Sequence, residues 1–276
     1  MNEPAIKFVD DLYTDKEIEE MLYEFREKGY VVLPDVLQRE SVEPFSKQLS
    51  DVMVFDGLKY TIPDDLPHYI HCLKAPRVLQ VLPSSLSHSV AKPYPSLHTT
   101  IIIIETDEMR GQYAPDWHKD REPDGMPSQS YHYPLDVFVA FYYEDITEDH
   151  GPTMIVPGSH RDLSLTPYNG SPIEPIYCRK QDALLLDQRA WHRGTPRKAP
   201  GTRFLIVYGL YAMPHFYGAN CHMPLSQRKE WLSAQKMRER ILYGGPFAPP
   251  DLETLEIMKK QLEEAGPPQI TYPRQA

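Results

Sequence analysis

The sequence predicts a mainly β protein, an antiparallel sandwich or barrel with flanking helices. Five runs rich in β-branched and aromatic residues are separated by turn-rich segments, and no long helical pattern lies between them, which argues against a βαβ series. The 28 prolines among 276 residues are scattered rather than repeated, as expected for many ordered loops. The strand candidates cover 99–104, 137–143, 153–156, 183–186 and 204–211.

The first fifty residues predict a helix, a short strand over 30–33 and a second helix over about 41–49. Apolar residues recur at helical spacing over 18–25, after a capping residue at Thr14 or Asp15. Residues 56–97 read as loops with one short helix, and helical patterns return near the C-terminus. We expect one domain over 1–276, with a helical N-terminal part at about 14–50, a barrel core at about 98–213 and C-terminal helices at about 225–265.

Composition excludes several classes of protein. The net charge of −10 disfavours binding to nucleic-acid phosphates, and we find no basic patch that would offset it. The three cysteines, Cys72, Cys178 and Cys221, form no CxxC pair and fit a reducing compartment. Neither a signal peptide nor an apolar run of membrane-spanning length is evident, so we expect a cytoplasmic protein without membrane or nucleic-acid partners.

Two His-x-Asp triplets are candidates for metal binding, His118-Lys119-Asp120 and His160-Arg161-Asp162. On a strand, positions i and i+2 share a face, so a histidine and a carboxylate can take adjacent corners of a metal. A third ligand from a distant strand completes a facial triad, which suits oxygen activation on Fe(II). His160 follows a Pro-Gly-Ser turn, so we expect it to be a loop residue, and we expect Lys119 to face outward or to lie in the barrel wall.

The third ligand candidate is His192, which follows the strand candidate 183–186. Arg203 lies eleven residues later, at the start of the most apolar strand of the chain. By itself, this arginine would be read as a surface or salt-bridged residue. A guanidinium beside an apolar strand needs a partner, and a dicarboxylate co-substrate would pair with it in a bidentate manner.

Several segments together carry a family resemblance. They are Trp117-His118-Lys119-Asp120, the run 148–161 with its Pro-Gly-Ser-His, His192 with Arg203, and the opening Gly29-Tyr30-Val31-Val32-Leu33. In this order and spacing they resemble the phytanoyl-CoA dioxygenase family of Fe(II)/2-oxoglutarate oxygenases, over roughly residues 15 to 215.

The resemblance implies a double-stranded β-helix, a jelly-roll barrel, and a reaction that uses Fe(II), 2-oxoglutarate and O2. It implies that His118, Asp120 and His192 are the iron ligands and that Arg203 binds the distal carboxylate of 2-oxoglutarate. Thr100 is a further candidate for that co-substrate. Some family members place a hydroxyl residue two positions after the distal histidine, where this chain has Gly194, with Thr195 next to it. Asp120 argues for oxygenation, because related halogenases have a small residue at that position.

The resemblance further implies oxidation of an unactivated C–H bond, with release of succinate and CO2. No basic cluster that would bind a coenzyme A phosphate is evident, so we expect a compact organic substrate from specialised metabolism and hydroxylation as the outcome. The same iron centre can also perform desaturation, epimerisation or ring formation. A non-catalytic metal-binding jelly roll and a cupin-like zinc isomerase would also fit the metal ligands taken by themselves, and Arg203 discriminates against both.

Three aromatic, loop-like segments are expected to form the mouth of the substrate pocket, 60–72, 121–133 and 211–222. The substrate candidates within them are Tyr131, His132, His215 and Phe216. No catalytic residue is expected beyond the iron ligands.

Overall fold

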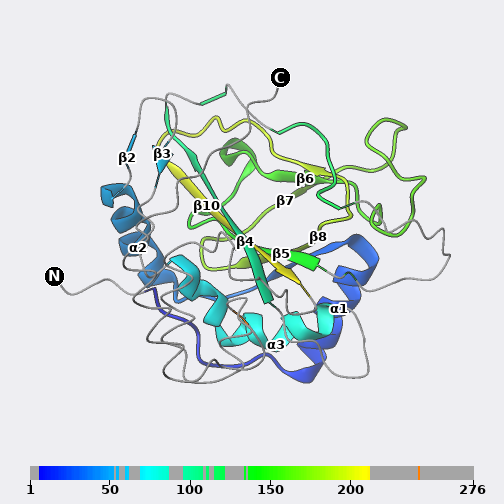
Figure 1. Cartoon of the computed structure of the whole chain (residues 1–276), viewed down its shortest axis with the longest axis horizontal. Helices are drawn as coiled ribbons and strands as arrows, with labels where there is room; N and C mark the ends of the chain where they lie inside the picture. Colours follow the sequence, from blue (N-terminus) through cyan, green and yellow to red (C-terminus); the bar gives the residue numbers. More distant parts are fainter. Residues whose placement is uncertain are drawn as a thin grey trace, which may run out of the picture.

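Two antiparallel sheets, a two-stranded ladder and several helices form the part of the chain that this computed structural model describes (Figure 1). The described residues are 6–52, 54–55, 60–61, 69–86, 96–107, 110–111, 115–121, 134, 136–211 and 242. The larger sheet has the order β1-β8-β5-β10-β4, and the smaller has the order β7-β6-β9. The ladder pairs β2 with β3.

The strands are β1 (Tyr30–Leu33), β2 (Val54–Phe55), β3 (Tyr60–Thr61), β4 (Ser96–Glu105), β5 (Asp136–Phe141), β6 (Thr153–Ile155), β7 (Glu174–Ile176), β8 (Ala183–Asp187), β9 (His192–Arg193) and β10 (Arg203–Tyr211). The helices are α1 (Asp15–Lys28), α2 (Arg39–Val52) and α3 (Pro76–Ser85), with 3-10 turns at η1 (Tyr69–Lys74) and η3 (Glu148–His150). The predicted strand at 30–33 and the five later strands are confirmed within a few residues. The first two helices are confirmed in the same way.

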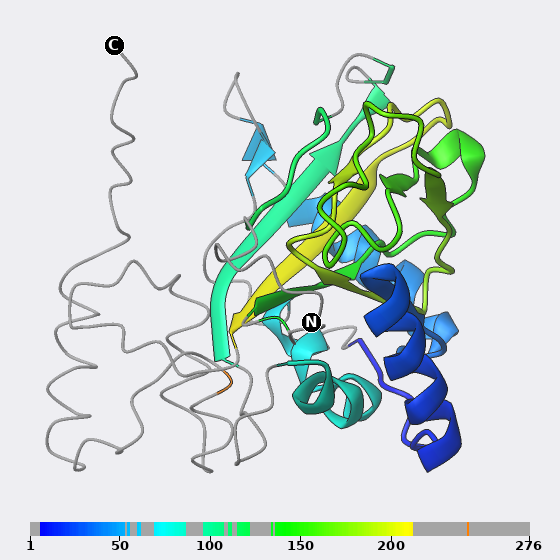
Figure 2. The same ribbon diagram turned by 90° about the vertical axis from the view of Figure 1, so that its right-hand side faces the viewer.

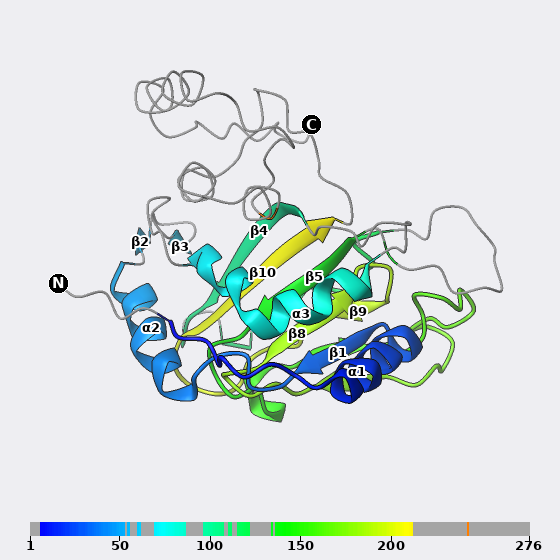
Figure 3. The same ribbon diagram turned by 90° about the horizontal axis from the view of Figure 1, so that it is seen from below.

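The larger sheet separates two hydrophobic cores because its side chains alternate between its faces. Phe204, Ile206 and Tyr208 of β10 lie in the core shared with the helices, whereas Leu205 lies in the core shared with the smaller sheet. Figure 3 shows the helices across one face of this sheet, and Figure 2 shows β4 and β10 running side by side. The core between the two sheets is the barrel interior.

The first helix is fixed at both ends by its sequence. Thr14 and Glu17 form a capping box, in which each side chain bonds the backbone N–H of the other residue. Gly29 ends the helix in the left-handed conformation with φ of 85°. An added Cβ at this glycine would lie 2.7 Å from Nδ1 of His160, so the close approach of α1 to the 157–160 turn also requires glycine.

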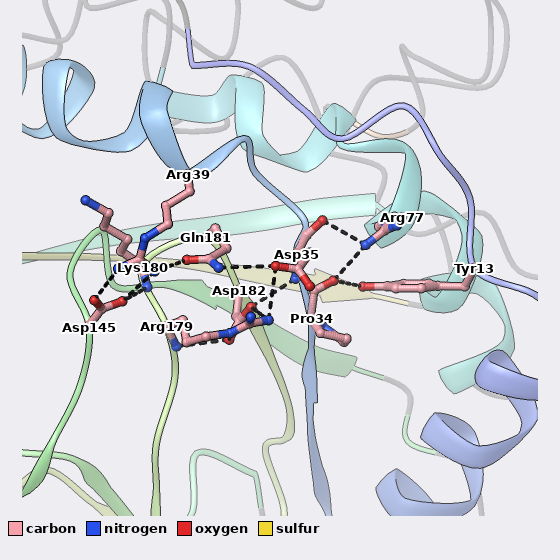
Figure 4. Close-up of polar contacts among 10 residues, drawn as sticks. All are labelled: Tyr13, Pro34, Asp35, Arg39, Arg77, Asp145, Arg179, Lys180, Gln181 and Asp182. Carbon is pink, nitrogen blue, oxygen red and sulfur yellow. Dashed lines mark hydrogen bonds and ion pairs between the residues drawn. The ribbon is translucent and has the colours of Figure 1, made fainter.

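A polar cluster ties the N-terminal segment to the loop before β8 (Figure 4). The Tyr13 hydroxyl and the Arg77 guanidinium both donate to the carbonyl of Pro34, at 2.5 and 3.2 Å. Asp182 is buried and accepts hydrogen bonds from the backbone N–H of Asp35 and from Arg179. The cluster therefore fixes the start of β8 against the end of β1, its antiparallel neighbour.

The predicted C-terminal helices at 225–265 lie outside the described residues, apart from Leu242, which is buried in the helix-side core. Within the described part of the chain, no helix has both the length and the apolar character needed to cross a membrane.

Candidate metal centre

His118, Asp120 and His192 converge at the end of the barrel. One ligand atom from each residue lies within 4.8 Å of those of the other two. His118 and Asp120 come from the segment 115–121, and His192 begins β9. The predicted triad is therefore assembled in space from two segments that are about seventy residues apart in the sequence.

The backbone holds two of these residues face to face. The N–H of His118 donates to the carbonyl of His192, and the N–H of His192 donates to the carbonyl of His118, both at 3.0 Å. This is a hydrogen-bonded antiparallel pair, in which the two side chains point to the same side. His192 is also paired with Ile155 of β6, whose side chain lies in the barrel interior, so the histidines face inward.

Hydrogen bonds fix the tautomers of both imidazoles. Nδ1 of His118 lies 2.6 Å from the carbonyl of Asp116, and Nδ1 of His192 lies 3.0 Å from the carbonyl of Ala190. A carbonyl can only accept, so each Nδ1 carries the proton and each Nε2 presents a lone pair. Those lone pairs face the Asp120 carboxylate, at 3.8 Å from His118 and 3.2 Å from His192. Two imidazole nitrogens and a carboxylate oxygen that converge in this way are the donor set of a divalent metal.

Asp120 is positioned by the residue that directly follows β8. Its N–H and that of Arg121 both donate to the carbonyl of Gln188, at 3.0 and 3.1 Å. The triad thus combines a backbone pair, which holds the two histidines, with a second backbone contact, which holds the carboxylate. Two histidines and one carboxylate leave three positions open on an octahedral metal, as in non-haem iron oxygenases.

Two cation–aromatic contacts bracket the histidine pair. The guanidinium carbon of Arg193 lies 5.0 Å from the ring centre of Trp117, and Nζ of Lys119 lies 5.5 Å from that of Trp191. Each contact joins a residue beside one histidine to a residue beside the other, because the antiparallel bridge places Trp117 near Arg193 and Lys119 near Trp191. We call these two contacts the flanking stacks.

The Pro-Gly-Ser-His turn supports the site from behind. The Ser159 hydroxyl accepts the N–H of Trp191 at 2.8 Å, and the Ser159 carbonyl accepts Nζ of Lys119 at 3.0 Å. His160 is not a member of the metal cluster. Its side chain is 2% exposed, and its Nε2 donates to the carbonyl of Arg26 in α1. Burial lowers the pKa of His160 to about 4, so its imidazole is neutral at pH 7.

Arg203 lies at the start of β10, 5% exposed. Its Nη1 donates to the carbonyls of His150 and Gly151, at 2.9 and 2.7 Å, and its Nη2 lies 2.7 Å from the Glu105 carboxylate. Among the described residues, its Nε has no hydrogen-bond partner. A buried donor without a partner is costly, so this N–H suits an incoming carboxylate.

Tyr142 lies in the barrel interior, in the same core as Ile155. The pKa of Tyr142 is raised to about 12, chiefly by burial, and Arg203 and Glu105 are among the charges that influence it. The Tyr142 hydroxyl lies 2.6 Å from that of Thr153 on β6. Two residues further along β6 is Ile155, the backbone partner of His192. Thr153 and Ile155 are two positions apart on β6, so their side chains project to the same face of the smaller sheet.

The other predicted co-substrate contacts are less directly placed. The Thr195 hydroxyl donates to the Pro152 carbonyl at 2.6 Å, which leaves its oxygen lone pairs for a further partner. Thr100 pairs in register with Tyr208 of β10, a residue of the helix-side core. Both assignments stay predictions. The substrate candidates Tyr131, His132, His215 and Phe216 lie outside the described residues.

Three features of the site were not anticipated from the sequence. They are the flanking stacks, the Glu105 carboxylate opposite Arg203, and the Tyr142–Thr153 contact. Glu105 directly follows the predicted strand 99–104. A charged residue at the end of an apolar strand was the sequence feature that could have indicated its contact with Arg203. The flanking stacks could have been indicated by the Trp-His-cation pattern, which occurs at both 117–119 and 191–193. An open hollow of about 670 Å³ near α2 is lined by none of the three triad residues.

Comparisons with known proteins identify the family and the fold of this chain. Residues 67–205, half of the chain, match the family model for phytanoyl-CoA dioxygenase (PhyH). The structure of HygX from Streptomyces hygroscopicus with nickel, 2-oxoglutarate and hygromycin B bound aligns with a TM-score of 0.53 at 20% identity, over 72% of this chain and 88% of that chain. AviO1 from Streptomyces viridochromogenes Tue57 aligns with a TM-score of 0.50 at 15% identity, over 72% of this chain and 96% of that chain.

These structural likenesses establish the fold, and the predicted jelly-roll barrel is confirmed. A search of curated proteins found no match to this chain.

Proposed function

The chain belongs to the phytanoyl-CoA dioxygenase (PhyH) family of iron- and 2-oxoglutarate-dependent oxidoreductases, and from this premise we propose that it hydroxylates a small molecule of specialised metabolism. The observation that carries the proposal is the triad of His118, Asp120 and His192, one ligand atom of each lying within 4.8 Å of those of the other two. We assign these residues as the iron ligands. The HygX structure, which holds hygromycin B, supports a compact organic substrate.

When bound, iron with 2-oxoglutarate and O2 supplies the chemistry of C–H oxidation, in which the keto acid leaves as succinate and CO2. Residues of the chain prepare this chemistry by position and charge. The carbonyls of Asp116 and Ala190 hold the imidazole protons on Nδ1, so that both Nε2 atoms stay available to the metal. The Gln188 carbonyl holds the backbone of Asp120, and the antiparallel bridge holds both histidines.

Arg203 would bind the distal carboxylate of 2-oxoglutarate. Its guanidinium is anchored by two backbone carbonyls and keeps one buried N–H without a partner among the described residues. The apolar walls of the barrel interior, among them Leu205 and Ile155, exclude water around this end of the site.

Anaerobic titration of the purified protein with Fe(II) and 2-oxoglutarate tests the metal and co-substrate assignments. We expect a weak visible charge-transfer band that needs both ligands and is lost in Arg203→Ala. Arg203→Lys retains a buried charge and should weaken the band rather than abolish it. A band of full intensity in Arg203→Ala would refute the assignment of this arginine.

Incubation with candidate natural products, followed by mass analysis, tests the reaction. We expect a product heavier by one oxygen atom, formed together with an equal amount of succinate. A loss of two hydrogens would indicate desaturation or ring formation, and a product of unchanged mass with inverted stereochemistry would indicate epimerisation. Binding of metal without succinate formation for any substrate would favour a non-catalytic barrel. We further propose that the enzyme acts in the cytoplasm.

A further inference from the structure

Glu105 and Arg203 stand directly opposite each other at the ends of β4 and β10. Antiparallel partners on the same register position project to the same side of the sheet. One oxygen of the Glu105 carboxylate lies 2.7 Å from Nη2 of Arg203, and the two side chains are only 13% and 6% exposed. The Glu105 carboxylate therefore lies within the barrel, beside the Arg203 guanidinium that we propose binds the co-substrate.

The hydrogen bonds of the Arg203 guanidinium are unevenly distributed. Nη1 is held by the carbonyls of His150 and Gly151, which belong to the backbone and cannot withdraw. Nη2 has the Glu105 contact, which is close enough for an ion pair. In the described part of the chain, however, neither that Glu105 oxygen nor Nε of Arg203 completes a hydrogen bond. The Glu105 contact is thus the one part of the arrangement that a ligand could replace.

The charges of Arg203 and Glu105 also indicate that a ligand would replace the Glu105 contact. With Glu105 in place, the buried Arg203 is neutralised before any ligand arrives. A second carboxylate would bring the net charge of the group to minus one, which is unfavourable because like charges in a buried site repel. It would also compete with Glu105 for Nη2 of Arg203. Nearby polar groups, the Tyr142 and Thr153 hydroxyls, carry no charge that could compensate.

We propose that Glu105 is a built-in competitor for the distal carboxylate of 2-oxoglutarate and sets the affinity of the co-substrate site. The proposal rests on the proposed function, in which Arg203 binds that carboxylate. In the absence of co-substrate, Glu105 stabilises the fold by pairing with a buried cation. Upon binding, this contact is exchanged for one with the ligand, so the co-substrate binds less tightly than Arg203 alone would allow.

The proposal makes two linked predictions for Glu105→Gln. The ligand-free protein should unfold at a lower temperature, because a buried guanidinium loses its counter-charge. The dissociation constant for 2-oxoglutarate should fall by about tenfold, the factor expected when one competing charge-assisted contact is removed. A purely structural role would lower stability without improving binding.

The experiment uses the nickel-loaded protein, so that no turnover occurs, and measures binding by calorimetry and the unfolding midpoint by thermal scanning. 2-Oxopentanoate serves as the matched ligand, because it retains the keto acid but carries a methyl group in place of the distal carboxylate. Its dissociation constant should be nearly the same in wild type and Glu105→Gln. Glu144→Gln serves as the matched variant, since Glu144 pairs with another buried arginine, Arg197, and neither residue contacts Arg203 through its side chain in any described hydrogen bond or ion pair. It should lower the midpoint and leave 2-oxoglutarate binding unchanged.

Unchanged or weaker binding of 2-oxoglutarate to Glu105→Gln would overturn the proposal, as would an equal gain for both keto acids. If Glu105→Gln does not fold, Glu105→Asp retains the charge but withdraws it by one methylene, and tighter binding is again the expected result. A separate result would show that the proposed function itself, in which Arg203 binds 2-oxoglutarate, is wrong. In that case Arg203→Lys would bind 2-oxoglutarate as tightly as wild type, whatever the Glu105 variants show.

Discussion

The backbones of His118 and His192 form a reciprocal antiparallel pair, with each N–H donating to the other residue's carbonyl at 3.0 Å. Their rings lie with centres 4.4 Å apart and Nε2 atoms directed to the same carboxylate. The distance between the two imidazole ligands is therefore fixed by the sheet and not by the metal. A site built in this way should remain folded when one of its side chains is changed.

Asp120→Asn tests that separation of fold and metal affinity. The amide is nearly isosteric but lacks the negative charge, so we expect the dissociation constant for Fe(II) to rise. The increase should exceed the roughly 10–100-fold that is typical when a hydrogen-bond partner of a metal ligand is removed. The unfolding midpoint of the metal-free protein should stay close to that of wild type, because Asp120 is held mainly by its backbone. Anaerobic metal titration and thermal scanning measure the two quantities.

Asp162→Asn is the matched control, because it alters the other His-x-Asp triplet. Asp162 is exposed and hydrogen-bonded to Ser164, outside the triad. Its variant should bind Fe(II) as wild type does. Equal losses in the two variants would contradict the assignment of Asp120.

Arg193→Met tests the flanking stacks. Methionine retains much of the apolar contact with Trp117 but removes the cation, and an interaction of this kind contributes about 0.5–2 kcal/mol. We expect metal affinity to fall by up to about tenfold, as for residues that orient a ligand without touching the metal. Arg26→Met removes a comparable contact with Tyr23 on α1, away from the triad, and should leave metal affinity unchanged. An unchanged affinity in Arg193→Met would mean that the stack only packs.

The sequence, with its family resemblance, was sufficient to predict which three residues converge, because the His-x-Asp triplet is a local and chemical signal. A histidine and an aspartate two residues apart can share a face of extended backbone, and the family resemblance implied that the distant His192, eleven residues before Arg203, is the third ligand. The strands were predictable for a related reason. The run before Glu105 is β-branched, and Arg203 precedes the most apolar segment of the chain.

Contacts that depend on register could not be predicted in this way. The Glu105–Arg203 pair requires the alignment of β4 with β10, and a shift of one residue would separate the two side chains. His160 shows the same limit. Its Pro-Gly-Ser context correctly predicted a turn, but its burial depends on α1, whose Arg26 carbonyl is 134 residues away in the sequence.

Asp182→Ala should destabilise the fold without acting on the metal site. The Asp182 carboxylate is 5% exposed and accepts hydrogen bonds from Asp35 N–H and from three groups of Arg179. Removing the acceptor leaves these donors unsatisfied, and we expect a loss of about 3 kcal/mol in the free energy of unfolding. Urea unfolding measures this loss. Glu20→Ala, which removes an exposed ion pair with Lys16, should change stability by less than about 1 kcal/mol. Similar losses in the two variants would contradict the structural role of the cluster.

His160 should make the stability of the protein fall as the pH is lowered from about 6.5 to 4. Burial lowers the pKa of this side chain from its usual 6.5 to about 4, so between these values the unfolded chain binds a proton that the folded chain does not. Stability rises with pH wherever the unfolded state binds more protons, so the effect is absent above pH 6.5 and complete near pH 4. The shift corresponds to about 3 kcal/mol.

His160→Gln should remove this part of the pH dependence, since the glutamine amide can donate to the Arg26 carbonyl but does not titrate. The measurement is urea unfolding at pH 7, 5.5 and 4.5, with the difference between wild type and variant plotted against pH. That difference cancels contributions that the two proteins share, including those of the aspartates. Parallel profiles for wild type and His160→Gln would show that the buried imidazole does not control acid stability, because only a group that titrates differently in the two states can change the slope.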